Sequence, residues 1–156
     1  MDIMQKAELL DKHLHLFTDN FYTNIPLAEK LFSRNTYLTG TINNKRSKRM
    51  CKEAFQHKIG AKDSVYFRKN EILLVVFKQA AKRKPVYVLT TAGDAEETNV
   101  TSKRSLGVKP LLIHTYNQFM GGVDNSDKSI YHLVPGYVPM LLRIANCFKL
   151  KSKRNF

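Results

Sequence analysis

The 156-residue sequence predicts an α/β fold, and three features of its hydrophobic pattern support this prediction. A strand–helix–strand pattern occupies residues 14–42, three strand-like runs follow at 64–91, and a helix-compatible segment with two aspartates lies at 114–131. Two strands separated by one helix are typical of a parallel βαβ unit, whereas short strands separated by polar turns are typical of an antiparallel meander. We therefore expect a βαβ unit, a β-rich antiparallel segment and an aspartate-bearing helix.

The βαβ unit begins with a β-prone run at residues 14–18 that ends at Asp19. Asn24 is placed to cap the following helix, which opens with an Ile-Pro pair, because asparagine accepts an orphan amide hydrogen and proline is tolerated in the first turn. A second strand is expected at residues 36–42. Asp19 therefore lies where a strand gives way to a loop, the position at which α/β folds place their chemistry.

The middle of the chain contains three β-rich runs, at residues 64–68, 72–77 and 86–91, which we expect to form a small antiparallel meander. Residues 92–109 are polar and mixed, with scattered glycines, so they are predicted to be a long connection. Two basic segments interrupt this region, one after the second predicted strand and one before the last run. They contain Lys45, Arg46, Lys48, Arg49, Lys82, Arg83 and Lys84.

The charge balance favours a polyanionic partner. Lysine and arginine number 26 against 13 aspartates and glutamates, which gives a formal net charge of +13 and places nucleic acid ahead of an anionic membrane surface. The two basic segments are either solvated loops or phosphate contacts. The longest apolar run, at 72–77, is far shorter than the roughly 20 residues of a membrane span. We expect DNA as partner, no membrane span and no small-molecule substrate.

The segment at 114–131 carries Asp124 and Asp127 after a pair of glycines. If this segment is helical after the glycines, Asp127 lies on the same helix face as apolar residues, and Asp124 lies on the adjacent face. A carboxylate pressed against an apolar face must be paired, protonated or bound to a metal. Two interpretations stay open: an aspartate caps the helix or pairs with Lys128, or the aspartates belong to a metal site.

Three stretches occur in a fixed order, TDNFYTNIPLAEKL at 18–31, TYLTGT at 36–41 and YNQFMGGVDNSD at 116–127. Together they resemble the piggyBac-type transposases and the piggyBac transposable element-derived proteins. The resemblance implies a catalytic domain at 1–133 with a partial ribonuclease H-like core and a β-rich insertion at about 60–92. It also implies metal-dependent DNA cutting and joining by three aspartates. Asp19 is similar to the second of these and Asp124 to the third, and Asp127 matches the acidic residue one turn later, so these three side chains are the expected ligands of Mg²⁺ or Mn²⁺.

The sequence departs from the family pattern at both ends. Only 18 residues precede Asp19, and neither Asp2 nor Asp11 lies in the context of the family's first catalytic aspartate. Residues 134–156 form a divergent basic tail without tryptophan. Because a bridging carboxylate is needed to hold a pair of metal ions, we expect weak metal binding and no DNA cleavage by the chain alone.

The sequence therefore predicts an internal fragment of a piggyBac-type transposase that acts on DNA, as a homodimer or together with an intact transposase. Basic stretches at 45–49 and 149–154 are typical of import signals, so a nuclear location is expected. The alternative is a nonenzymatic DNA- or chromatin-binding domain in which the aspartates are structural. An RNA-binding protein is disfavoured because the sequence has no aromatic RNA-recognition motif.

Overall fold

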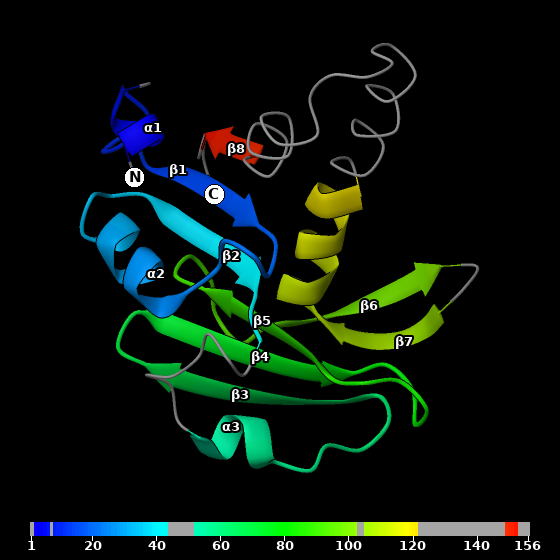
Figure 1. The fold of residues 1–156 in the computed structure, drawn as a ribbon. Coiled ribbons are helices and arrows are strands. Elements are labelled where there is room, and N and C mark those ends of the chain that lie inside the picture. Colours follow the sequence, from blue (N-terminus) through cyan, green and yellow to red (C-terminus); the bar gives the residue numbers. More distant parts are fainter. Residues whose placement is uncertain (1, 7, 44–51, 103–104, 122–148, 153–156) are drawn as a thin grey trace, which may run out of the picture.

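The computed structural model describes residues 2–6, 8–43, 52–102, 105–121 and 149–152. Its centre is a six-stranded sheet in the order β3-β4-β5-β2-β1-β8 (Figure 1). The helices are α1 (Asp2–Lys6), α2 (Ile25–Phe32), α3 (Lys52–Gln56) and a fourth at residues 111–121, here called helix 111–121. The strands are β1 (Leu14–Thr18), β2 (Tyr37–Thr41), β3 (Asp63–Lys69), β4 (Ile72–Lys78), β5 (Val86–Thr90), β6 (Glu97–Ser102), β7 (Ser105–Pro110) and β8 (Lys149–Ser152).

The predicted βαβ unit is confirmed. Strands β1 and β2 are parallel neighbours, with Leu16 opposite Leu38, and α2 connects them. The predicted cap also forms, because Asn24 Oδ1 accepts a hydrogen bond of 2.9 Å from the Leu27 N–H at the start of α2. The local sequence signals therefore place Asp19 directly after β1, as expected.

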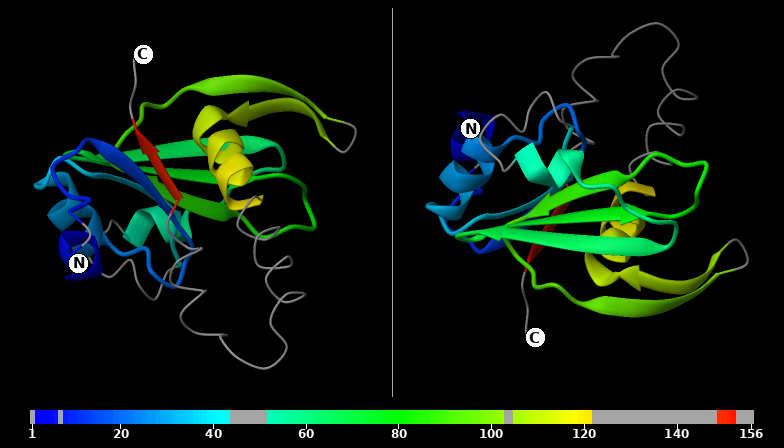
Figure 2. Two further views of the ribbon diagram at one scale, coloured as in Figure 1. Left: turned by 90° about the horizontal axis from the view of Figure 1, so that it is seen from above. Right: turned by 90° about the horizontal axis from the view of Figure 1, so that it is seen from below.

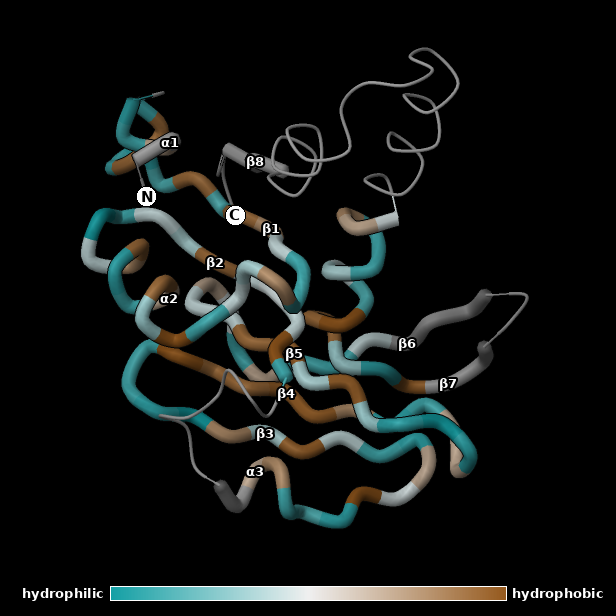
Figure 3. Tube along the Cα trace, in the orientation of Figure 1, coloured by the Kyte–Doolittle hydropathy of each residue, from teal (hydrophilic) through white to brown (hydrophobic). Residues whose placement is uncertain are grey.

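The predicted antiparallel meander is also present, as β3, β4 and β5. It is continuous with the βαβ unit, because β5 pairs antiparallel with β2 and places Thr39 opposite Thr90. Strand β4 is buried over its first six residues, and Figure 3 shows it as a hydrophobic strand in the middle of the fold. The β-rich segment thus extends the sheet that carries Asp19.

Both faces of the sheet are covered, which explains why β4 is an unbroken apolar run. Alternate residues of β4 point to opposite faces, so Leu74 packs in one core cluster with α1, α2 and α3, while Val75 packs in another with Ile113 of helix 111–121. Figure 2 shows α1, α2 and α3 on one side of the sheet and helix 111–121 on the other. The result is a three-layer α/β/α arrangement.

The prediction of a long connection at 92–109 is wrong. Strands β6 and β7 form an antiparallel hairpin, with Asn99 opposite Val108. Its base is attached to β3, where the Ser64 and Tyr66 hydroxyls donate to Glu97 Oε1 at 2.7 and 3.1 Å. The hairpin is rich in serine, threonine and lysine, so it carries little of the apolar alternation from which strands are recognised.

The C-terminal part of the chain contributes helix 111–121 and strand β8 to the described structure. Helix 111–121 lies before the helix expected after the glycine pair, and that expected helix falls within 122–148, outside the described residues. In the basic tail predicted at 134–156, β8 joins the sheet by antiparallel pairing with β1, which places Leu150 opposite Leu16.

Candidate functional site

Asp19 is the first residue after β1 and is partly buried. Its Oδ1 accepts hydrogen bonds from the N–H groups of Phe21, at 2.9 Å, and Tyr22, at 3.3 Å. This side-chain-to-backbone turn holds the carboxylate at the carboxyl end of a parallel strand, the edge at which α/β sheets bind their ligands. Both of these hydrogen bonds are accepted by Oδ1. Because a carboxylate has lone pairs on both oxygens, the Asp19 side chain can also bind a cation.

The turn after Asp19 is fixed by Thr23 and Gly40. The Thr23 hydroxyl donates to the Asp19 carbonyl at 2.6 Å and lies 2.8 Å from Thr18 Oγ1. A Cβ on Gly40 would lie 2.1 Å from Thr23 Oγ1 and 2.5 Å from Thr18 Oγ1. Only glycine allows β2 to approach the end of β1 this closely.

Helix 111–121 packs against the same strand end. The Tyr116 hydroxyl donates to the Thr18 carbonyl at 3.2 Å, and the ring of Phe119 stacks on Phe17 with centroids 4.2 Å apart. The helix therefore reaches the residues that immediately precede Asp19. The predicted partners Asp124 and Asp127 follow this helix and lie outside the described residues, so their catalytic and metal-binding roles stay predictions.

Part of the predicted basic surface lies at the same sheet edge. Lys82, Arg83 and Lys84 are exposed in the turn between β4 and β5, where the Arg83 N–H donates to the Ala80 carbonyl at 3.0 Å. Because β5 is antiparallel to β2, this turn lies at the edge where β1 and β2 end. The other predicted DNA contacts, Lys45, Arg46, Lys48 and Arg49, lie outside the described residues.

An open groove of about 410 Å³ runs along this edge. Asn20 and Thr41 line it at the ends of β1 and β2, and Pro85 and Tyr87 line it where β5 begins. Burial raises the pKa of the Tyr87 phenol above its ordinary value. The groove therefore extends from Asn20, the residue after Asp19, to Pro85, the residue after Lys84.

The donor atoms at this edge are hard oxygens, which suit Mg²⁺ or Mn²⁺ better than softer metals. Within the described ranges, no three acidic, histidine or cysteine side chains cluster as a set of metal ligands. A metal at this edge would therefore need Asp19 together with ligands from outside those ranges. No helix in the described part of the chain is long and apolar enough to cross a membrane.

Sequence reasoning did not assign roles to Gly40, Thr23 and Tyr116, although all three lie within the family-like stretches. Their contacts join residues that are distant in sequence, since Tyr116 is 98 positions from Thr18. Phe21 was also missed, and its side chain is 62% exposed beside Asp19.

The family model described as Transposase IS4 matches residues 3–137, so the chain belongs to this family of transposases. DDE transposases of this kind generally use divalent metal ions. Within the family, the chain is of the piggyBac type, which confirms the resemblance. It is 28% identical over 144 residues to the human PiggyBac transposable element-derived protein 3 and to the human Chimeric ERCC6-PGBD3 protein.

The chain spans only part of these relatives. Each alignment covers 82% of this chain, but 23% of the first human protein and 13% of the second. The cryo-EM structure of a piggyBac transposase synaptic complex with hairpin DNA matches with a TM-score of 0.58 and 26% identity, over 74% of this chain and 23% of that one. The mixed α/β sheet is therefore similar to part of a piggyBac transposase structure.

Proposed function

We propose that this chain forms part of the catalytic region of a piggyBac-type transposase, with a ribonuclease H-like arrangement of β1, α2 and β2. Asp19 and Asp124 are the proposed ligands of a divalent cation, with Asp127 at the margin. The observation that carries this proposal is the packing of helix 111–121, which precedes Asp124, against the strand end that precedes Asp19.

The chain length supports the meeting of these two carboxylates. Phe119 stacks on Phe17, and helix 111–121 ends two residues later. Asp124 follows Gly121 by three residues, a span of at most about 11 Å in a fully extended chain. The chain therefore allows Asp124 to approach Asp19, and the binding experiment below tests whether the two carboxylates share a cation.

The proposed roles of the protein groups follow from this placement. Asp19 and Asp124 would hold Mg²⁺ or Mn²⁺ through carboxylate oxygens, and the bound ion would supply activation of an attacking oxygen and stabilisation of a leaving oxygen. The sequence offers residues similar to the second and third catalytic aspartates, which is too few to hold two ions close together. The isolated 156-residue chain is therefore expected to bind a cation weakly and not to cleave DNA.

DNA is the proposed partner, because the chain has a net charge of +13 and an exposed basic turn lies at the edge that carries Asp19. The piggyBac transposase with the similar structure was solved in complex with hairpin DNA. We propose a nuclear location on the same basic character, and either a homodimer or association with an intact transposase. A tagged copy excluded from the nucleus would contradict the proposed location.

The metal site is tested by Mn²⁺ binding to the purified chain, followed by electron paramagnetic resonance of the free ion. Asp19→Asn and Asp124→Asn should each weaken binding, and the double variant should abolish it while the fold is retained, because removing like charge relieves repulsion in the metal-free state. Asp63→Asn is the matched control, since Asp63 Oδ1 also accepts a backbone N–H at 2.9 Å but lies on the distant strand β3. Unchanged Mn²⁺ binding in Asp19→Asn would leave the nonenzymatic DNA-binding domain as the better interpretation.

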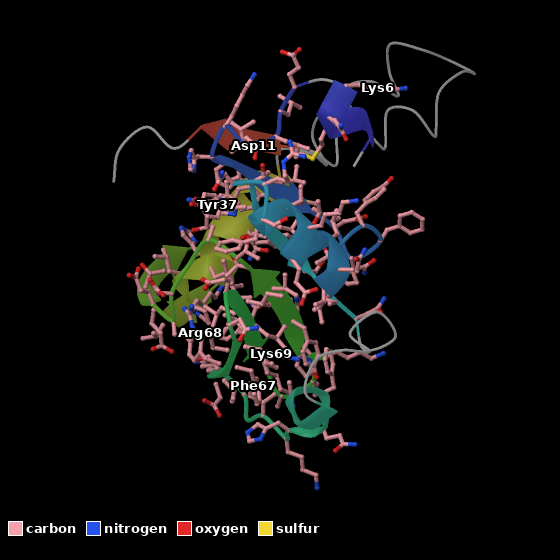
Figure 4. All side chains as sticks on the ribbon, turned by 90° about the vertical axis from the view of Figure 1, so that its left-hand side faces the viewer. Lys6, Asp11, Tyr37, Phe67, Arg68 and Lys69 are labelled. Carbon is pink, nitrogen blue, oxygen red and sulfur yellow. The ribbon has the colours of Figure 1, made fainter. Side chains whose placement is uncertain are left out.

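DNA binding is tested by the dependence of affinity on salt. Each phosphate contact contributes about −0.9 to the slope of log affinity against log salt. Replacing all three residues of the exposed basic turn by alanine should flatten this slope. The control removes three exposed lysines from the opposite end of the fold, among them Lys69, which Figure 4 labels on β3: Lys12, Lys30 and Lys69. Equal flattening by both triple variants would reject a DNA surface at the edge of Asp19.

A further inference from the structure

We propose that Tyr116 is a positioning residue for Asp19: its hydroxyl fixes the peptide group that carries Asp19 and so sets the direction of the carboxylate toward a divalent cation. This inference rests on the proposed metal-binding role of Asp19. It adds a residue from helix 111–121 to a site otherwise built on the ends of β1 and β2.

Tyr116 connects the two parallel strands at the point where both end. Its side chain is buried, with 8% of the residue exposed, and its hydroxyl donates to the Thr18 carbonyl at 3.2 Å. Thr41 Oγ1 lies 3.1 Å from the same phenol oxygen. A phenol has one hydrogen to donate, so with that hydrogen on the Thr18 carbonyl, the Thr41 hydroxyl is the donor in the second bond.

The contact with Thr18 acts on Asp19 through a rigid group. The Thr18 carbonyl and the Asp19 N–H belong to one planar peptide unit, so fixing the carbonyl fixes the orientation at the Asp19 Cα. On the other side of Asp19, the Thr23 hydroxyl holds the Asp19 carbonyl at 2.6 Å. Asp19 is therefore held from both sides, by the turn that follows it and by Tyr116 before it.

The substitution Tyr116→Phe isolates this effect, because it removes one oxygen and keeps the ring. Helix 111–121 remains attached through Ile113 in the core and through Phe119 on Phe17. The matched control is Tyr66→Phe, since the Tyr66 hydroxyl also donates one hydrogen bond, at 3.1 Å to Glu97, but lies on β3. In the sheet, β4, β5 and β2 separate β3 from β1.

The test is a set of Mn²⁺ dissociation constants measured on the full 156-residue chain. Tyr116→Phe should raise Kd about fivefold, the factor that corresponds to one hydrogen bond, and Tyr66→Phe should leave it unchanged. The same substitution is then made in two backgrounds. With Asp124→Asn, where Asp19 is the remaining catalytic ligand, Tyr116→Phe should still raise Kd; with Asp19→Asn, it should have no effect.

Each outcome has one meaning. An equal effect of Tyr116→Phe in both backgrounds would show a general structural role and overturn the inference, as would an unchanged Kd in the otherwise native chain. If Asp19→Asn itself leaves Kd unchanged, the proposed metal site fails and this inference fails with it. If Asp19→Asn weakens binding and Tyr116→Phe does not, the metal site stands and only the positioning role is rejected.

Discussion

Replacing Gly40 by alanine should be among the most damaging single changes in this protein. A Cβ at this position would lie 2.1 Å from Thr23 Oγ1, 2.5 Å from Thr18 Oγ1 and 2.7 Å from the Thr18 carbonyl oxygen. All three distances are far below van der Waals contact, and the carbonyl belongs to a paired strand that cannot rotate away. Strand β2 or the end of β1 must therefore shift.

The expected cost follows from two contributions. Overpacking a close-packed site costs about 1–3 kcal/mol. Moving Thr23 also breaks its 2.8 Å contact with the Thr18 hydroxyl, which adds about 1 kcal/mol. The free energy of unfolding should fall by about 2–4 kcal/mol, a large share of the roughly 5–15 kcal/mol that is usual for a domain.

Urea unfolding followed by circular dichroism measures this change. With a slope of about 2 kcal/mol per M, the midpoint should fall by about 1–2 M without a change in slope. Gly60→Ala is the control, because a Cβ there meets only Asp63 side-chain atoms at 3.8 Å. Adding Thr23→Ala to Gly40→Ala should recover part of the loss, since it removes the shortest contact. A change of less than about 0.5 kcal/mol in Gly40→Ala would refute the close approach of β2 to β1.

Three further predictions concern stability. Phe17→Ala should lower the free energy of unfolding by about 3–5 kcal/mol, because Phe17 is 1% exposed and stacked on Phe119. Phe21→Ala should change it by no more than about 0.5 kcal/mol, because Phe21 is 62% exposed. Equal urea midpoints for the two variants would contradict this prediction. The hydrogen-bonded Arg34 guanidinium holds the pKa of Asp11 below its ordinary 3.8. This ion pair therefore stabilises the fold above pH 3.8, and its contribution is lost as the pH falls through the lowered pKa. Asp11→Asn should have a lower urea midpoint than the native chain at neutral pH and the same midpoint in strongly acidic buffer. Asn24→Ala should cost about 1 kcal/mol by removing the cap of α2. Asn24→Asp keeps the acceptor for the Leu27 N–H but loses the hydrogen bond from the Asn24 amide to the Tyr22 carbonyl, so it should cost less than Asn24→Ala in thermal unfolding.

Much of the fold could be predicted from the sequence because its signals are local. The β-prone apolar runs of β1 to β5, the Asn24 cap and the polar turns act within a few residues, and each of these elements forms where expected. The β6–β7 hairpin was not predicted, because its strands gain their stability from each other and from Glu97 at β3 rather than from their own hydrophobic pattern.

In the candidate site, too, some features follow from local sequence signals and others only from the packing of distant segments. The sequence by itself determined that Asp19 ends a strand, that the chain is strongly basic, and that three stretches are of the piggyBac type. Only the tertiary structure decided that β5 pairs with β2, which brings Lys82 to the edge of Asp19, and that Tyr116 reaches Thr18 across 98 positions. Propensity and capping fix the conformation of a segment, but the partner of a strand or a hydroxyl depends on how all segments pack together, and no local pattern encodes that choice.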